Sequence, residues 1–262
     1  MKTIKIITII CAVALLSAAC HKEVAPEQVI SATFMVDTPA TKVINDGLSA
    51  TKLLVRIFDS NHELLQEETY TRGDGGWLVK LTLVPSVYSI SFWACSPESD
   101  AFSFEDEFVT VDYNKMDMNS DVEDAFWASL ADMEMTTSIS RTVTLKRPLA
   151  CVQLVSDTFL DEDLKDATSS FRITGMISTK LNLITGEAGE ARRKVSFAAA
   201  PIADYAIDRH PVVALAYALV DEAGITAAEV EYTITMKDGR VSEGAVINVP
   251  MERNHLTTLK DY

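Results

Sequence analysis

The sequence predicts a mainly β protein with two β-sandwich domains in tandem and a short helix near the connection between them. Apolar and polar residues alternate with a period of two in several runs, which is typical of strands with one buried face. Turn sequences rich in glycine, asparagine and aspartate separate these runs. The runs gather on either side of residues 114–135, and a chain of 262 residues has room for two domains.

Four runs show the alternation most clearly, and each is expected to form a strand. The side chains expected on their buried faces are Trp77, Val79, Leu81 and Leu83 in "WLVKLTLV"; Tyr88, Ile90, Phe92 and Ala94 in "VYSISFWA"; Ile139, Val143 and Leu145 in "ISRTVTLK"; and Val230, Tyr232, Ile234 and Met236 in "EVEYTITM". The turns expected between strands are "NDG" at 45–47, "GDGG" at 73–76, "TG" at 185–186 and "KDG" at 237–239.

One segment between the two groups of strands predicts a helix. In "NSDVEDAFWASLADM", Ser120 and Glu123 have the spacing of a capping box. The apolar face expected after it consists of Val122, Ala125, Phe126, Ser129 and Leu130. "DEDLKDA" at 161–167 predicts a second, shorter helical turn. The expected domains are therefore residues 29–135 and 136–262.

The first nineteen residues predict a signal peptide. Residues 1–5 supply positive charge, and residues 6–16 form an apolar run of eleven residues, whereas a membrane-spanning helix needs about 20. Ser17-Ala18-Ala19-Cys20 resembles the lipobox of bacterial lipoproteins, with Ser17 where leucine is usual. Cleavage between Ala19 and Cys20, acylation of Cys20 and a tether over residues 20–28 are expected. A buried N-terminal element, or an ordinary signal peptidase cutting after Ala19, are the alternatives.

The charge and the cysteine content argue against a nucleic-acid-binding protein and against a disulfide-rich protein. The formal net charge of −15 repels phosphate backbones, so no nucleic-acid partner is expected. Cys11 leaves with the signal peptide, and Cys95 and Cys151 lie in apolar runs. Two cysteines in a chain of this length do not make a disulfide framework, so buried free thiols are favoured.

No motif predicts catalysis, a metal site or a cofactor. The four histidines, His21, His62, His210 and His255, are far apart in the sequence and lack neighbouring cysteines at zinc-ligand spacing. Residues 98–124 hold ten acidic residues, and "DMNSD" has the alternate spacing of a calcium loop. Val122 and Ala128 stand where such a loop needs glycine and glutamate, which favours a solvated acidic loop.

Two further features suggest ligand binding, and each has a simpler interpretation. "RGD" at 72–74 is an integrin-ligand tripeptide, but "TRGDGGW" is also a good hairpin turn. Trp77, Trp93 and Trp127 suggest a platform for stacking sugars, yet they lie in strand-like or helix-like runs. A turn and core packing are therefore favoured over binding.

Several segments, read in order, resemble one family. They are "INDGLSATKLLVRIFDSNHELL", "VYSISFWA", "EDAFWA", "VTLKRPLACVQL", "LNLITG", "LAYALV" and "NVPMERNHLTTL". In this order, behind a lipobox, they resemble the fimbrillin-like lipoproteins of Bacteroidales from about residue 30 to the end. The resemblance implies two transthyretin-like β-sandwich domains, with "VTLKRPLACVQL" opening the second, and export to the cell surface as a lipidated precursor.

The resemblance also implies a route to assembly. In polymerising members a trypsin-like protease removes the segment before the "DG…A" stretch, and a strand from a neighbouring subunit fills the groove that opens. Lys42 in "TPATKVINDG" lies nearest to that position, and Arg56 lies inside a predicted strand. The sequence stops at Tyr262, soon after "RNHLTT", which leads to the expectation of a capping or anchoring subunit, or of one that does not polymerise.

These observations predict a non-enzymatic lipoprotein of the outer membrane, exposed at the cell surface, that anchors, caps or builds a pilus-like assembly. The expected partners are outer-membrane lipid, through acylated Cys20, and other subunits, through β-strand addition. The alternative is a lipid-anchored adhesin that binds a glycan, host matrix or another bacterial surface and does not polymerise.

Overall fold

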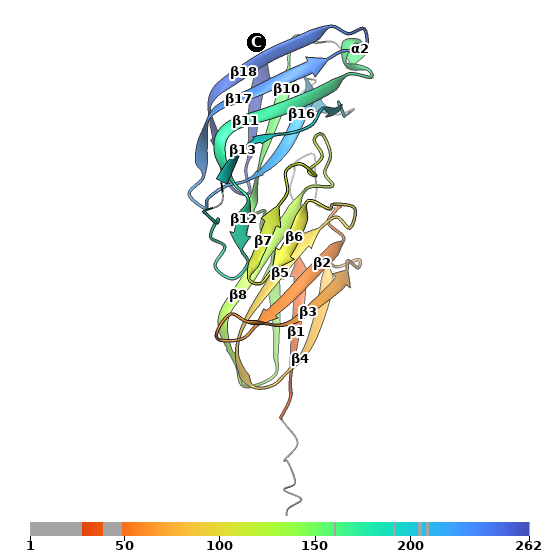
Figure 1. Ribbon diagram of the computed structural model, residues 1–262. Helices are drawn as coiled ribbons and strands as arrows, with labels where there is room; N and C mark the ends of the chain where they lie inside the picture. The colour runs from red at the N-terminus through yellow and green to blue at the C-terminus, as the bar shows by residue number, and fades with distance from the viewer. Residues whose placement is uncertain are drawn as a thin grey trace, which may run out of the picture.

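The computed structural model describes residues 28–38, 49–159, 161–190, 192–203, 206–207 and 210–261. Strands make up most of this part of the chain, and α2 (Asp161–Leu164) is its one helix. α2 confirms the short helical turn predicted over 161–167. The molecule in Figure 1 is elongated, with the N-terminal half at the lower end and the C-terminal half at the upper end.

The N-terminal half is a sandwich of two sheets. The first has the order β4-β1-β9 and the second the order β3-β2-β5-β8. β1 is central in the first sheet, antiparallel to β4 and parallel to β9. The strands are β1 (Ile30–Asp37), β2 (Lys52–Phe58), β3 (Leu64–Thr71), β4 (Trp77–Leu83), β5 (Ser86–Cys95), β8 (Ala125–Met135) and β9 (Ile139–Thr144).

The C-terminal half repeats this arrangement. Its sheets have the orders β15-β16-β10-β19 and β13-β11-β17-β18, with β14 paired to β11. β10 takes the place of β1, because it is antiparallel to β16 and parallel to β19. The strands are β10 (Leu149–Ser156), β11 (Thr168–Ser178), β13 (Arg192–Ser196), β14 (Ala200–Pro201), β15 (Ala206–Ile207), β16 (His210–Leu219), β17 (Ile225–Thr235), β18 (Val241–Met251) and β19 (Leu256–Asp261).

A small third sheet lies between the two halves in Figure 1. It has the order β12-β7-β6, from β6 (Phe102–Glu105), β7 (Phe108–Val111) and β12 (Lys180–Asn182). The buried hydroxyl of Tyr113 strengthens this junction, since it donates to the carbonyl of Ser178 at 2.9 Å and accepts from the amide of Leu219 at 2.8 Å.

The alternating runs predict the strands correctly, but one strand, β5, is buried on a face that was expected to be exposed. Trp77, Val79, Leu81 and Leu83 are buried in β4, and the apolar residues of β17 and β9 lie mostly on the inner faces. β5, in contrast, is buried on both faces from Tyr88 onward. The reason is that the third sheet covers its second face, where Trp93 packs edge-on against Phe102 at 5.2 Å.

The helix predicted after Ser120 is wrong. Residues 125–135 form β8, which pairs with β5 from Cys95↔Ala125 to Ser86↔Met135. Ser120 accepts a hydrogen bond from the amide of Val122 in a turn, and Glu123 is buried against Ser99. A ladder of this length, together with burial of Phe126, outweighs the weak local preference for helix.

The turns predicted at 73–76 and 237–239 are confirmed, and Gly76 and Gly239 have φ values of 97° and 86°. The turn predicted at 45–47 lies outside the described residues. The domain boundary between residues 135 and 136 stays a prediction, and β9, just beyond it, pairs with β1 in the N-terminal half. Within the described ranges, no helix is long and apolar enough to cross a membrane.

Cys95 and Cys151 are buried free thiols, as predicted. Burial raises the pKa of the Cys95 thiol to about 11 and raises the pKa of the Cys151 thiol further. Because the thiolate is the reactive form, iodoacetamide at pH 8 is expected to leave both unmodified in the folded protein and to label both in guanidinium chloride. Peptide mapping by mass spectrometry measures this, and labelling of either thiol within minutes in the native protein would contradict it.

Candidate functional site

The candidate site is the position occupied by β1. This strand lies between β4 and β9, so both of its edges are paired. Its inward side chains, Ile30, Ala32, Phe34 and Val36, are between 0% and 4% exposed, and Phe34 packs edge-on against Phe92 with ring centroids 5.4 Å apart. Removing β1 would open a groove with an apolar floor and two unpaired strand edges.

β1 is also placed so that it could leave the fold. It is the first element of the described chain, and Lys42 follows it in the sequence. Only alternate residues of β1 are buried, whereas all eight residues of its counterpart β10 are. A cut after β1 would leave the strand held by hydrogen bonds and by one apolar face.

The predicted processing and lipidation residues fall on different parts of the chain. Ala19, Cys20 and Lys42 lie outside the described residues. Arg56 lies in β2, is 4% exposed, and its Nε is 2.8 Å from Oε2 of Glu67; its guanidinium also donates to the carbonyl of Asp106. Processing at Arg56 stays a prediction, and it would require β2 to open first.

The "RGD" stretch forms the hairpin turn predicted for it. Gly73 and Gly76 form an isolated bridge, and their amides and carbonyls pair at 2.9 Å and 3.3 Å. The guanidinium of Arg72 lies over the Trp77 ring at 5.0 Å and donates to Thr38 at 3.1 Å. Arg72 is thus held against the protein and away from the turn.

The three tryptophans do not form a sugar-stacking platform. Trp77 is 0% and Trp93 1% exposed, and they belong to different core clusters. Trp127 is partly buried, donates from Nε1 to the carbonyl of Leu183 at 3.0 Å, and packs against Gly186, where a Cβ would lie 2.5 Å from the ring. Core packing, as favoured from the sequence, is confirmed for Trp77 and Trp93.

The "DMNSD" loop has a structural role that its spacing did not indicate. Oδ1 of Asn119 accepts from the amide of Leu215 at 2.8 Å, and Nδ2 donates to Ser169 and to the carbonyl of Pro201 at 2.9 and 3.0 Å. Asn119 therefore joins the acidic loop to the C-terminal half. No group of three or more metal-ligating residues occurs in the described ranges.

A buried ion pair at the junction was missed in the sequence. Nε of Arg147 donates to both carboxylate oxygens of Asp124 at 2.8 and 2.9 Å, and Nη2 donates to Oδ2 at 2.7 Å. Asp124 is 0% and Arg147 7% exposed. Burial lowers the pKa of Arg147, but the hydrogen bonds and charge of Asp124 outweigh this and raise it, so the guanidinium stays charged.

Three of the segments that carried the family resemblance meet at this junction. "EDAFWA" supplies Asp124, "LKRPLA" supplies Arg147, and "RNHLTT" supplies Arg253. Nε and Nη1 of Arg253 donate to the carbonyls of Val220 and Gly186, each at 2.7 Å. The pair of Asp124 with Arg147 joins the two halves, whereas the bonds of Arg253 lie within the C-terminal half.

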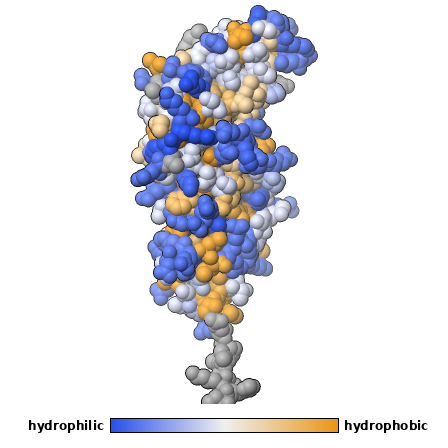
Figure 2. Space-filling model, in the orientation of Figure 1, coloured by the Kyte–Doolittle hydropathy of each residue, from blue (hydrophilic) through white to orange (hydrophobic). Residues whose placement is uncertain are grey.

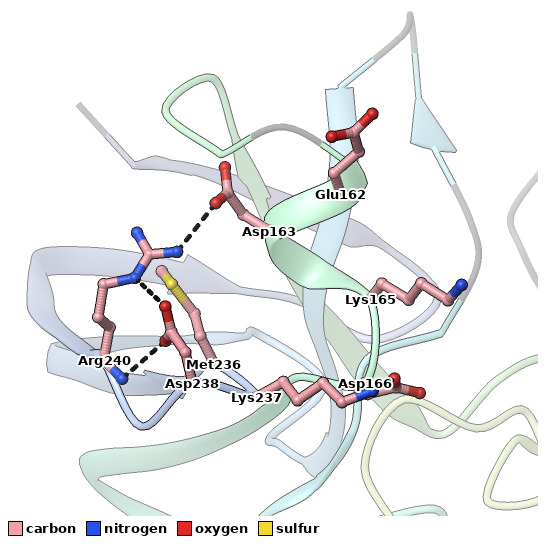
Figure 3. Close-up of a pocket in the computed structure, with 8 residues that line it drawn as sticks. All are labelled: Glu162, Asp163, Lys165, Asp166, Met236, Lys237, Asp238 and Arg240. Atoms are coloured by element: carbon pink, nitrogen blue, oxygen red, sulfur yellow. Dashed lines mark hydrogen bonds and ion pairs between the residues drawn. The ribbon is translucent and has the colours of Figure 1, made fainter.

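A charged pocket of about 310 Å³ lies beside α2, at the turn between β17 and β18 (Figure 3). Five of its seven charged residues pair with each other: Arg240 with Asp163 at 3.0 Å and Asp238 at 2.6 Å, and Lys237 with Asp166 at 2.6 Å. These exposed pairs satisfy one another, so the pocket offers little to a ligand.

The face of the molecule in Figure 2 is mostly polar, with smaller apolar areas. The large apolar side chains exposed among the described residues include Met35 at 43%, Leu65 at 57% and Leu78 at 49% in the N-terminal half. Met35 and Leu78 are directly opposite on the outer face of β1 and β4. Two neighbouring side chains are too few to define a binding surface.

Comparison with known proteins gives one family and a shared fold. The sequence matches the family described as "Family of unknown function (DUF6562)" over residues 25–262. No curated protein matches it.

Three solved structures share the fold at low sequence identity. A candidate polysaccharide-binding protein (DUF1812) of Bacteroides thetaiotaomicron is 13% identical, with a TM-score of 0.54 over 84% of this chain and 80% of that one. A candidate adhesin of Bacteroides ovatus is 11% identical, with a TM-score of 0.52 over 90% and 89%. A candidate cell adhesion protein of the same species is 8% identical, with a TM-score of 0.51 over 90% and 92%.

Proposed function

The chain belongs to DUF6562, a family of unknown function, and from this premise we propose that it is a non-enzymatic surface lipoprotein that anchors, caps or builds a pilus-like assembly by strand addition. The single observation that carries the proposal is the position of β1, a buried central strand that precedes Lys42. The similarity of fold to candidate Bacteroides adhesins is consistent with a role in adhesion at the cell surface.

In this proposal Cys20 carries the lipid that holds the precursor to the outer membrane. Each buried methylene of an acyl chain contributes about 0.8 kcal/mol, so two or three chains suffice for a stable anchor. Cleavage after Lys42 separates β1 and the lipid from the rest of the chain. The exposed edges of β4 and β9 then accept a strand from a neighbouring subunit, which satisfies the backbone donors and acceptors left by β1.

A trypsin-like protease is expected to convert the purified chain into a form that begins at residue 43 and assembles once β1 has left. Intact-mass spectrometry identifies the new N-terminus, and light scattering with electron microscopy follows assembly. Lys42→Ala is expected to prevent both changes. A chain that is cut after Lys42, loses β1 and stays monomeric would contradict the proposal.

A peptide control shows whether the β1 position is the acceptor. A synthetic peptide of residues 29–38 is expected to occupy the groove of the cleaved protein and to block assembly. The same peptide with Phe34→Ser is expected to block poorly, because Phe34 is fully buried in the groove. Equal blocking by the two peptides would place the acceptor elsewhere.

The alternative, a lipid-anchored adhesin that binds a glycan or host matrix and does not polymerise, has less support from this chain. The candidate polysaccharide-binding protein shares the fold, but burial of Trp77 and Trp93 removes the aromatic platform that motivated the alternative. Binding of the intact Lys42→Ala variant to a glycan array would favour it.

A further inference from the structure

An unpaired strand edge lies in the C-terminal half. β18 is the last strand of the sheet β13-β11-β17-β18, and it lies along the outer left side of the upper half in Figure 1. It pairs with β17 from Thr235↔Val241 to Ile225↔Met251. No strand of the described chain pairs with its other side. Every second residue of such an edge directs its amide and carbonyl away from the sheet.

The edge is open over residues 241–247. A groove of about 660 Å³ runs along residues 242–247, with Tyr232 and Lys260 among its lining. β19 donates to β18 beyond this stretch, from the hydroxyl of Thr257 to the carbonyl of Pro250 at 2.6 Å. Asn248, with φ of 56°, ends the regular segment.

The open segment lacks the features that usually protect a sheet edge. Natural edges carry lysine, proline or inward charges that discourage pairing. Here Val241 is 56% and Ile247 68% exposed, and Glu243 is the one charged residue of the segment. Pro250 lies outside it. An edge of this kind is suited to a partner strand.

We propose that this partner is the same segment of a second copy, paired antiparallel about a two-fold axis at Gly244. In this register Val241 lies opposite Ile247 of the partner, and Ile247 opposite the partner's Val241. Two apolar cross-strand pairs therefore cover the exposed side chains on both chains. The contact is isologous, so it closes as a dimer and joins the two sheets into one.

The charges of the segment select this register over its neighbours. A two-fold axis at Glu243 would place two carboxylates directly opposite, and an axis at Ala245 would place Glu243 opposite Ile247. With the axis at Gly244, Glu243 lies opposite Ala245, and the two glutamates are diagonal neighbours, with Cα atoms about 7–8 Å apart. A Cβ at Gly244 would lie 2.3 Å from the Tyr232 hydroxyl oxygen, so glycine lets that side chain cross the strand.

Paired cysteines test this register directly. The full-length Val241→Cys/Ile247→Cys variant is expected to form a disulfide-linked dimer under mild oxidation, seen on non-reducing gels and by mass spectrometry. Residues 241 and 247 of one strand are about 20 Å apart, so they cannot bridge within one chain. The single variants Val241→Cys and Ile247→Cys are matched controls. They are expected to run as monomers on non-reducing gels, because each cysteine lies opposite a residue without a thiol and no disulfide can form across the pair.

A second measurement determines the oligomeric state by sedimentation, in chains without added cysteines. The full chain is expected to sediment as a dimer and Ile247→Lys as a monomer, since charge at this edge opposes pairing. Residue 247 is exposed, so the substitution is not expected to affect folding. The proposal is overturned if the double-cysteine variant crosslinks no more than the single variants, if Ile247→Lys leaves the sedimentation coefficient unchanged, or if the cysteines link to a different protein.

Discussion

Replacing Asp124 with asparagine is expected to lower the free energy of unfolding by about 3–5 kcal/mol, because it leaves the Arg147 charge buried without a counter-ion. Three hydrogen bonds of 2.7–2.9 Å join the two side chains, and both are shielded from water. The pair lies where the two halves meet. Chemical denaturation followed by tryptophan fluorescence measures the change.

Asp166→Asn is the matched control for this prediction. It removes the same charge from an ion pair of 2.6 Å with Lys237 that is exposed to solvent, and such pairs contribute about 0–1 kcal/mol. Asp124→Asn/Arg147→Met is expected to recover part of the loss, since it removes the unpaired charge as well. Equal destabilisation by Asp124→Asn and Asp166→Asn would show that the buried pair is not important for stability.

Replacing Phe34 with alanine is expected to cost about 3–5 kcal/mol, the range for deleting a buried aromatic ring from a core. Phe34 is fully buried at the centre of β1 and packs against Phe92. The amides of β1 are expected to lose protection against hydrogen exchange along with global stability. Exchange measured by mass spectrometry, with denaturation, separates loosening of the strand from unfolding of the whole protein.

Met35→Ala is the control. Met35 follows Phe34 in β1, so its side chain points to the opposite face of the strand, and it is 43% exposed. It is expected to change stability by less than about 1 kcal/mol. If the two variants were equally stable, burial of the inner face of β1 would not be what holds the strand in place. The strand could then leave without the cost that the proposed processing has to overcome.

The repeated strand order explains why one strand of this protein is a candidate for exchange and its counterpart is not. β1 and β10 have equivalent neighbours, one antiparallel and one parallel. β10, however, is buried on both faces, and residues on both sides of it are part of the described fold. Only β1 combines one exposed face with a position before Lys42.

Local sequence patterns were sufficient for much of the strand content. The alternation in 77–84 and 229–236 corresponds to strands β4 and β17, and the glycines at 76 and 239 adopt the positive φ that their turns require. These features depend on side-chain type and on neighbours a few residues away, which the sequence displays directly. The burial of the two thiols and of Trp77 and Trp93 was likewise predictable, because all four lie in apolar runs.

The tertiary structure decided whatever depends on residues far apart. Pairing with β5 made a strand of 125–135, where capping and spacing predicted a helix. The bond between Asn119 and Leu215 spans 96 positions, and the pair of Arg147 with Asp124 spans 23. No period in the sequence encodes such contacts, because they form only when separate strands are brought together. The sequence by itself therefore determined a β-rich chain, and its signal peptide and lipobox stay predictions. Which strand is central and which edge is open were decided by strand pairing within each half, and the burial of the Asp124–Arg147 pair was decided by the packing of the two halves.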